Sequence, residues 1–129
     1  MLRYLLLAAI ALTLLASCAP AASIGGSAAM SHTLNGIVYQ TLTAPSAKVR
    51  TAAINALARM QIKLVSDKTI EDGKVRQVTA KTKERKIEIE LEAISPNTTR
   101  MRVTAKSSPF FYDSATAEEI NAQTKKSLG

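Results

Sequence analysis

The sequence is poor in the residues that build crosslinks, metal sites and aromatic clusters. Its 129 residues include one cysteine, one histidine, two phenylalanines, three tyrosines and no tryptophan. A single thiol excludes an internal disulfide framework and any metal site made from several cysteines. The length fits one domain. We therefore expect one small fold held by its hydrophobic core, with no metal and no cofactor.

Charge is nearly absent from the first third of the chain, where no charged residue occurs between Arg3 and Lys48. This region opens with an apolar run, Leu5–Leu15, of eleven residues. As a helix the run would rise about 16 Å, roughly half of a hydrocarbon core near 30 Å thick. It is therefore too short to span a membrane, and the basic start followed by a short apolar core is typical of a secretory signal.

The only cysteine follows this run directly. Leu15-Ala16-Ser17-Cys18 resembles the lipobox of bacterial lipoproteins, in which the cysteine is acylated and becomes the mature N-terminus. The resemblance implies a signal peptide over 1–17 and a Cys18 that carries a diacylglyceryl group and an N-acyl chain such as palmitate, a stable anchor. Ala19 then favours the outer membrane, facing the periplasm. The alternative is an ordinary signal peptide cut near 19–22, with Cys18 discarded.

Residues 18–33 are small and polar, carry no charge and include Gly25-Gly26. Because no helical or strand period runs through them, we expect a lipidated cysteine followed by a flexible tether. His32 lies at the end of this stretch, and a lone tether histidine predicts a solvent-exposed side chain. The globular domain then covers 34–129.

Hydrophobic periodicity predicts an α+β fold for this domain. Its strands are expected at 37–42, 62–66, 75–83, 87–93 and 100–106, and its helices at 46–59 and 116–128. Ser46 is the expected N-cap of the first helix, and Thr116 with Glu119 forms a capping box for the second. The order is β-α-β-β-β-β-α, a small antiparallel sheet with both helices packed on one face.

Loop lengths predict how the charged strands pair. A three-residue loop at 96–98 places Glu88 opposite Lys106 and Glu92 opposite Arg102. A two-residue loop at 84–85 places Lys81 beside Glu88, and a longer loop of the same parity remains open. The outer face is then an acidic strand between two basic ones. It is either a solvated charge ladder or a binding face.

The candidate partner-binding residues are basic or aromatic and follow this face into the next loop: Arg100, Arg102, Lys106, Phe110, Phe111 and Tyr112. The three aromatic residues either cover one edge of the core or form an exposed docking patch. The chain has a net charge of +7, and this basic character would draw the domain to an acidic envelope protein, anionic lipid, lipopolysaccharide or cell-wall polymer. Five aromatic rings are too few for stacking on bases, so nucleic acid is not an expected ligand.

Catalytic chemistry has few candidates. The carboxylates whose spacing would suit acid-base catalysis are Glu88, Glu90 and Glu92, which lie about 6.5–7 Å apart along one strand face. That separation occurs in glycosidases, so a hydrolase is the enzymatic alternative. We expect each carboxylate to be held by a basic neighbour, and therefore a non-catalytic interaction or accessory module.

The stretch 38–128 resembles a family of small lipoproteins of Gram-negative bacteria known only as a domain of unknown function. The similarity lies in the strand at 39–42, the alanine-rich helix at 46–60, the Gly73 hairpin and Thr99-Arg100-Met101-Arg102-Val103. This last run is a shortened form of a Thr-Arg-x-x-Ile-Arg-Val pattern. Gln61 and Tyr112 replace glycines that many members carry. The resemblance implies no catalytic residues.

Overall fold

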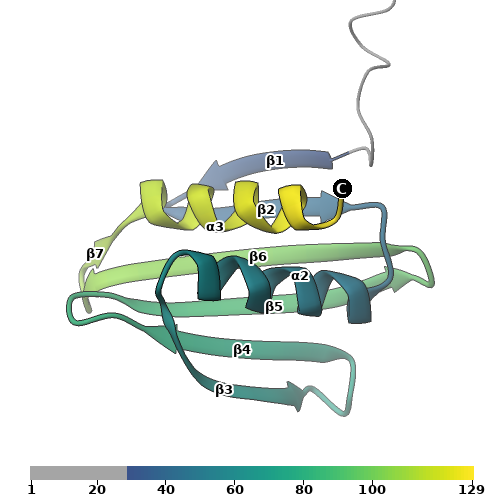
Figure 1. Cartoon of the computed structure of the whole chain (residues 1–129), viewed down its shortest axis with the longest axis horizontal. Helices are drawn as coiled ribbons and strands as arrows, with labels where there is room; N and C mark the ends of the chain where they lie inside the picture. Colours follow the sequence, from purple (N-terminus) through teal and green to yellow (C-terminus); the bar gives the residue numbers. More distant parts are fainter. Residues whose placement is uncertain (1–28) are drawn as a thin grey trace, which may run out of the picture.

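A computed structural model describes residues 29–129 as one antiparallel sheet with two helices on one face (Figure 1). The elements in chain order are β1 (Ala29–Leu34), β2 (Ile37–Leu42), α2 (Ser46–Arg59), β3 (Lys63–Ile70), β4 (Val75–Lys81), β5 (Lys86–Ser95), β6 (Thr98–Ser108), β7 (Phe111–Tyr112) and α3 (Ser114–Ser127). This confirms the α+β fold and its predicted order, to which β1 and β7 are additions. The predicted signal peptide and Cys18 lie outside the described residues.

The strand order across the sheet is β1-β2-β6-β5-β4-β3, and the short β7 pairs with β6. Helix α3 packs on β2 and β6, while α2 packs on β3, β5 and β6 and also contacts α3. We call the face covered by the helices the inner face and the opposite one the outer face. Only the inner face is covered by other parts of the described chain.

The core lies between the inner face and the helices. Alternating side chains of the two central strands are at most 2% exposed: Ile87, Ile89, Leu91, Met101, Val103 and Ala105. The buried surface of α2 consists largely of alanines, which allow its backbone to approach the sheet closely. The face assignments made from sequence alternation are therefore confirmed for both strands.

The sheet begins earlier than the sequence analysis expected. Asn35 and Gly36 both have positive φ, 52° and 80°, as a type I′ turn requires. This turn folds residues 29–34 back onto β2, so residues 29–33 belong to the sheet although they were assigned to the tether. His32 is also not isolated, because its ring stacks on Tyr39 with centroids 5.0 Å apart.

Replacing Gly36 by alanine should destabilise the domain by about 1–3 kcal/mol. A Cβ at this position would lie 2.5 Å from the Tyr112 Cβ, and φ is +80°. Gly73→Ala is the matched control, since its φ is +87° but its nearest side-chain atom is 4.0 Å away. Urea unfolding of both variants measures the difference. An equal loss in both would show that contact with Tyr112 contributes nothing.

Both helices begin with a different cap from the one predicted. Pro45 precedes α2, and its carbonyl accepts hydrogen bonds from the amides of Lys48 and Val49 at 3.0 and 3.1 Å, with no side-chain cap. Helix α3 begins at Ser114 because Asp113 is its cap, accepting from the Thr116 amide at 3.1 Å. Ser46 and the Thr116 capping box are therefore wrong assignments. In each helix the actual cap stands before the predicted one.

Asp67 of β3 links helix α2 to the edge of the sheet formed by β3 and β4. Its carboxylate accepts from the Arg76 Nε at 2.6 Å and is also paired with Arg50 of α2. The carboxylate is largely buried, with 12% of the side chain exposed. Hydrogen bonds from Arg76 and then Arg50 lower the pKa of Asp67 to about 2.

Candidate functional site

The observed strand register differs from the predicted one at two turns, and these differences determine which side chains lie at one end of the outer face. The turn between β5 and β6 has two residues, and a bulge at Ile94 restores the face parity, so Glu92 lies opposite Arg100 and Lys86 opposite Lys106. The turn between β4 and β5 has four residues, 82–85, so Lys81 also lies opposite Lys86. The predicted pairs of Glu88 with Lys106 and Lys81 are therefore wrong by two residues. The longer turn that the sequence left open is the one observed.

These shifts bring four lysines into cross-strand register. Lys63 pairs with Lys81, Lys81 with Lys86, and Lys86 with Lys106, across β3, β4, β5 and β6. Because neighbouring strands are about 4.8 Å apart, the row is about 15 Å long. Within residues 31–129 none of the four lysines forms an ion pair. We call these four residues the lysine row.

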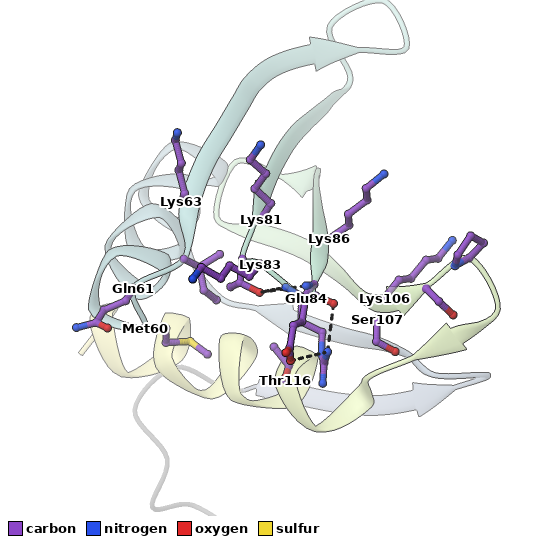
Figure 2. A pocket seen from close by; sticks show the side chains of 15 residues that line it. Met60, Gln61, Lys63, Lys81, Lys83, Glu84, Lys86, Lys106, Ser107 and Thr116 are labelled. Carbon is purple, nitrogen blue, oxygen red and sulfur yellow. Dashed lines mark hydrogen bonds and ion pairs between the residues drawn. The ribbon is translucent and has the colours of Figure 1, made fainter.

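The lysine row borders two hollows of the surface. A groove of about 1600 Å³ at the end of the sheet is lined by the row together with Lys83, Arg85 and a single acidic residue, Glu84. Figure 2 shows the four side chains of the row extending to the same side, away from the helices. A trough of about 390 Å³ on the outer face shares Lys81, Lys86 and Lys106 with the groove and includes Arg102, Glu88 and Tyr112. Among the charged residues that line each hollow, basic side chains therefore outnumber acidic ones.

Like charges placed directly opposite on neighbouring strands destabilise a sheet. The row holds three such contacts in succession, and its members are exposed except Lys106, which is partly buried. The Lys106 ammonium is stabilised locally, because it lies 5.0 Å from the centre of the Tyr112 ring. An anionic ligand spanning the row would relieve the repulsion, so the geometry fits a ligand with several phosphate or carboxylate groups.

The wall of the groove is fixed by Arg85 and Asp113. The Arg85 Nε donates to the Asp113 carboxylate at 2.7 Å, which joins the β4–β5 turn to the start of α3. Hydrogen bonds from the Thr116 side chain, then Arg85 and the Thr116 amide, lower the pKa of Asp113 to about 2. Arg85 is thus paired with a carboxylate of the fold, whereas no lysine of the row has a carboxylate partner among the described side chains.

Acid should destabilise the domain through Asp67 and Asp113. Both have a folded pKa near 2, below the ordinary value near 3.9, so the unfolded chain binds protons first as the pH falls. Their stabilisation is complete above about pH 4 and is lost towards pH 2, an effect of about 2–3 kcal/mol together. Urea unfolding measured at intervals from pH 6 to pH 2 gives this difference. The Asp67→Asn, Asp113→Asn double variant should lose most of it, and an unchanged acid dependence in that variant would contradict the assignment.

The two arginines predicted to bind a partner each form an ion pair with a glutamate of β5. Arg102 lies 3.3 Å from Glu90, and Arg100 lies 3.7 Å from Glu92. Burial raises the pKa of Glu90, and the charge of Arg102 opposes that shift. Glu88 faces Thr79 and Thr104 across the neighbouring strands. Two of the three carboxylates of the hydrolase hypothesis are therefore engaged with arginines.

The aromatic residues of the predicted site lie at the same end of the sheet as the lysine row. Phe110 is in the β6–β7 turn and Phe111 begins β7, and they are 87% and 68% exposed. Tyr112, 44% exposed, pairs with Lys106. The three aromatic residues therefore form an exposed patch and do not cover an edge of the core. The predicted residues Lys106 and Tyr112 thus lie at the lysine row, whereas the sequence analysis did not single out Lys63, Lys81 or Lys86.

Two further findings concern the described part of the chain. Residues 29–129 contain no cluster of three or more His, Cys, Asp or Glu side chains placed to hold a metal ion. None of the helices in this range combines the length and hydropathy needed to cross a membrane.

Comparison with known proteins gives a family but no activity. No curated protein is significantly similar to the chain. A family model described as protein of unknown function, DUF3568, matches residues 1–126. That match covers almost the whole sequence, including the strands that carry the lysine row. The chain therefore belongs to the DUF3568 family of proteins of unknown function.

Proposed function

We propose that the chain is a lipid-anchored, non-catalytic module of the bacterial cell envelope that binds an anionic component through the lysine row. The observation that carries this proposal is the register of Lys63, Lys81, Lys86 and Lys106 on four adjacent strands. Cys18, acylated as its lipobox resemblance implies, supplies the anchor. We expect the protein at the outer membrane, facing the periplasm.

The charge arrangement favours an anionic ligand over docking through the arginines. Arg100 and Arg102 have glutamate partners on β5, so their charges are largely neutralised locally. The lysine row has no such partners among the described side chains and opens onto the groove and the trough. A ligand with regularly spaced phosphates or carboxylates would contact several ammonium groups at once. Each exposed lysine near an anionic surface contributes about 1 kcal/mol.

The pairing of Glu90 and Glu92 with arginines favours a binding role over hydrolysis. Glu90 and Glu92 hold Arg102 and Arg100, so neither is placed to act as the acid or base of a hydrolysis. Glu90→Gln and Glu92→Gln should therefore not weaken anion binding. If the protein showed a hydrolytic activity that these variants abolished, the result would support the hydrolase hypothesis.

Polyphosphate is a defined probe for the lysine row. Full-length protein in neutral detergent micelles should bind it, and the triple variant Lys81→Gln, Lys86→Gln, Lys106→Gln should lose about 3 kcal/mol, on the order of 100-fold in affinity. Titration calorimetry at fixed ionic strength measures both. The removal of three charges should also weaken the salt dependence of binding.

A second triple variant separates the row from net charge. Lys48, Lys125 and Lys126 are exposed on α2 and α3, and changing all three to glutamine removes the same charge from the helical side. We expect a loss of less than about threefold, because long-range attraction alone is affected. Equal losses in the two variants would mean that polyphosphate responds to net charge and that the row has no special role.

A further inference from the structure

Two phenyl rings stand exposed beside the lysine row. Phe110 and Phe111 are the most exposed of the large apolar side chains in the described part of the chain. Ser107, Ser108 and Pro109, which lead into them, line the groove together with Lys86 and Lys106. We call Pro109, Phe110 and Phe111 the aromatic tip. The tip and the row thus form one continuous surface at one end of the sheet.

This combination fits a lipid bilayer better than a soluble polymer. A polymer bound along the row would neutralise the lysines but leave both phenyl rings in water. At a bilayer the rings enter the boundary between headgroups and acyl chains, while the ammonium groups contact lipid phosphates. We propose that the aromatic tip and the lysine row dock on the anionic lipid leaflet that also holds the Cys18 anchor. This inference rests on the proposed function, since it takes the row as an anion-binding surface and Cys18 as acylated.

The position of the tip explains why a second contact would matter. Ala29 pairs with Leu42, which pairs with Thr99 at the start of β6, whereas Gly36 lies against Tyr112 at the other end. Figure 1 shows β7 and the start of β1 at opposite ends of the sheet. From Thr99 to Ser108 the strand extends about 30 Å. Without tip docking the domain could stand end-on, and with it the domain lies along the membrane.

The anchor makes a weak tip contact sufficient. The ten residues 19–28 between Cys18 and β1 reach at most about 36 Å, enough for the domain to turn its outer face to the same leaflet. An anchored domain experiences that leaflet at a high effective concentration, so docking needs little intrinsic affinity. A different bilayer would have to be met by diffusion.

The natural lack of tryptophan permits a local test on the full acylated protein. Phe110→Trp introduces a single indole at the tip, and Ala58→Trp introduces one on the exposed part of α2. Each is reconstituted in vesicles of phosphatidylcholine, with or without phosphatidylglycerol, containing brominated lipids that quench indole on contact. The anchor holds every sample in the membrane, so quenching reports only the position of the indole.

The proposal predicts emission at shorter wavelength and at least about twofold stronger quenching for Trp at 110 in anionic vesicles, and no such change for Trp at 58. The Lys81→Gln, Lys86→Gln, Lys106→Gln background should abolish the effect. Unquenched indole at 110 with intact polyphosphate binding would overturn tip docking while leaving the proposed function in place. Quenching that persists in the triple variant would overturn the role of the row. If the indole were quenched only when brominated vesicles without protein were added, the tip would contact a different membrane, which contradicts the proposal. If one protein co-purified with the chain and shielded the indole at position 110 from quenching, the tip would be a site for that protein, which also contradicts it.

Discussion

Lys86→Glu should stabilise the domain and at the same time weaken anion binding. Lys86 stands between Lys81 and Lys106, so the substitution replaces two like-charge contacts with two opposite-charge contacts. Each cross-strand pair changes stability by about 0.2–1 kcal/mol, which gives an expected gain of about 1 kcal/mol. For a domain of this size that corresponds to a rise in Tm of about 4–8 °C.

The same substitution should lower polyphosphate affinity by more than about tenfold, because it removes one cation and places an anion at the centre of the row. Calorimetric scanning and titration of one preparation measure both effects. Lys125→Glu on α3 is the control, with the same change of charge and no neighbour in the row. If the variant gained stability and kept its affinity for polyphosphate, the lysine row would have no role in binding. If the variant lost stability, the observed pairing of Lys86 with Lys81 and Lys106 would be contradicted.

Leu91→Ala should cost about 2–5 kcal/mol, because it removes a large side chain from the core. Leu91 is 1% exposed at the centre of β5 and packs in the core between the sheet and the helices. The loss combines removed apolar contacts with the cavity that the rigid sheet cannot close. Urea unfolding followed by circular dichroism gives the free energy.

Glu92→Ala is the matched control one residue away. Its side chain is 48% exposed on the outer face, and its partner Arg100 is 54% exposed. Pairs of this kind contribute about 0–1 kcal/mol. Losses of equal size at positions 91 and 92 would mean that the two faces of β5 had been assigned the wrong way round.

Alternation allowed the faces of the sheet to be predicted, whereas the register required local geometry. A shift of two residues keeps every side chain on its face, so the hydrophobic pattern cannot detect it. The bulge at Ile94 compensates for a turn one residue shorter than predicted. On an unbroken strand a two-residue turn would place Glu92 opposite Met101, a core residue, and the bulge avoids that mismatch.

The composition of the candidate site followed the same division. The sequence pointed to four candidate binding residues because they lie at the end of a clearly alternating strand or directly after it: Lys106, Phe110, Phe111 and Tyr112. Lys63, Lys81 and Lys86 were missed, since only the observed turns align them. The four-residue turn is held by the Thr82 amide donating to the Arg85 carbonyl at 2.9 Å and by the Thr82 hydroxyl accepting from the Arg85 amide at 3.0 Å. Such a turn has no glycine or proline to announce it.

The strand β1 had a signal that composition concealed. Asn35-Gly36 is a strong indicator of a tight hairpin, but the residues before it are small and polar and show no alternation of apolar side chains. Pairing along the whole of β2 holds them in place. Tertiary context therefore decided the structure of a segment whose own propensity is weak.

The most direct test of the lysine row is its chemical accessibility in the native envelope. Membranes from cells expressing the full-length protein are treated with an amine-acylating reagent, and modified peptides are quantified by mass spectrometry before and after a high-salt wash. The account predicts that Lys63, Lys81, Lys86 and Lys106 are protected in the intact membrane and become reactive when salt screens the contact. Lys48, Lys125 and Lys126 should react equally in both states. Free reaction of the row in intact membranes, at the rate of the helix lysines, would contradict the proposed binding surface.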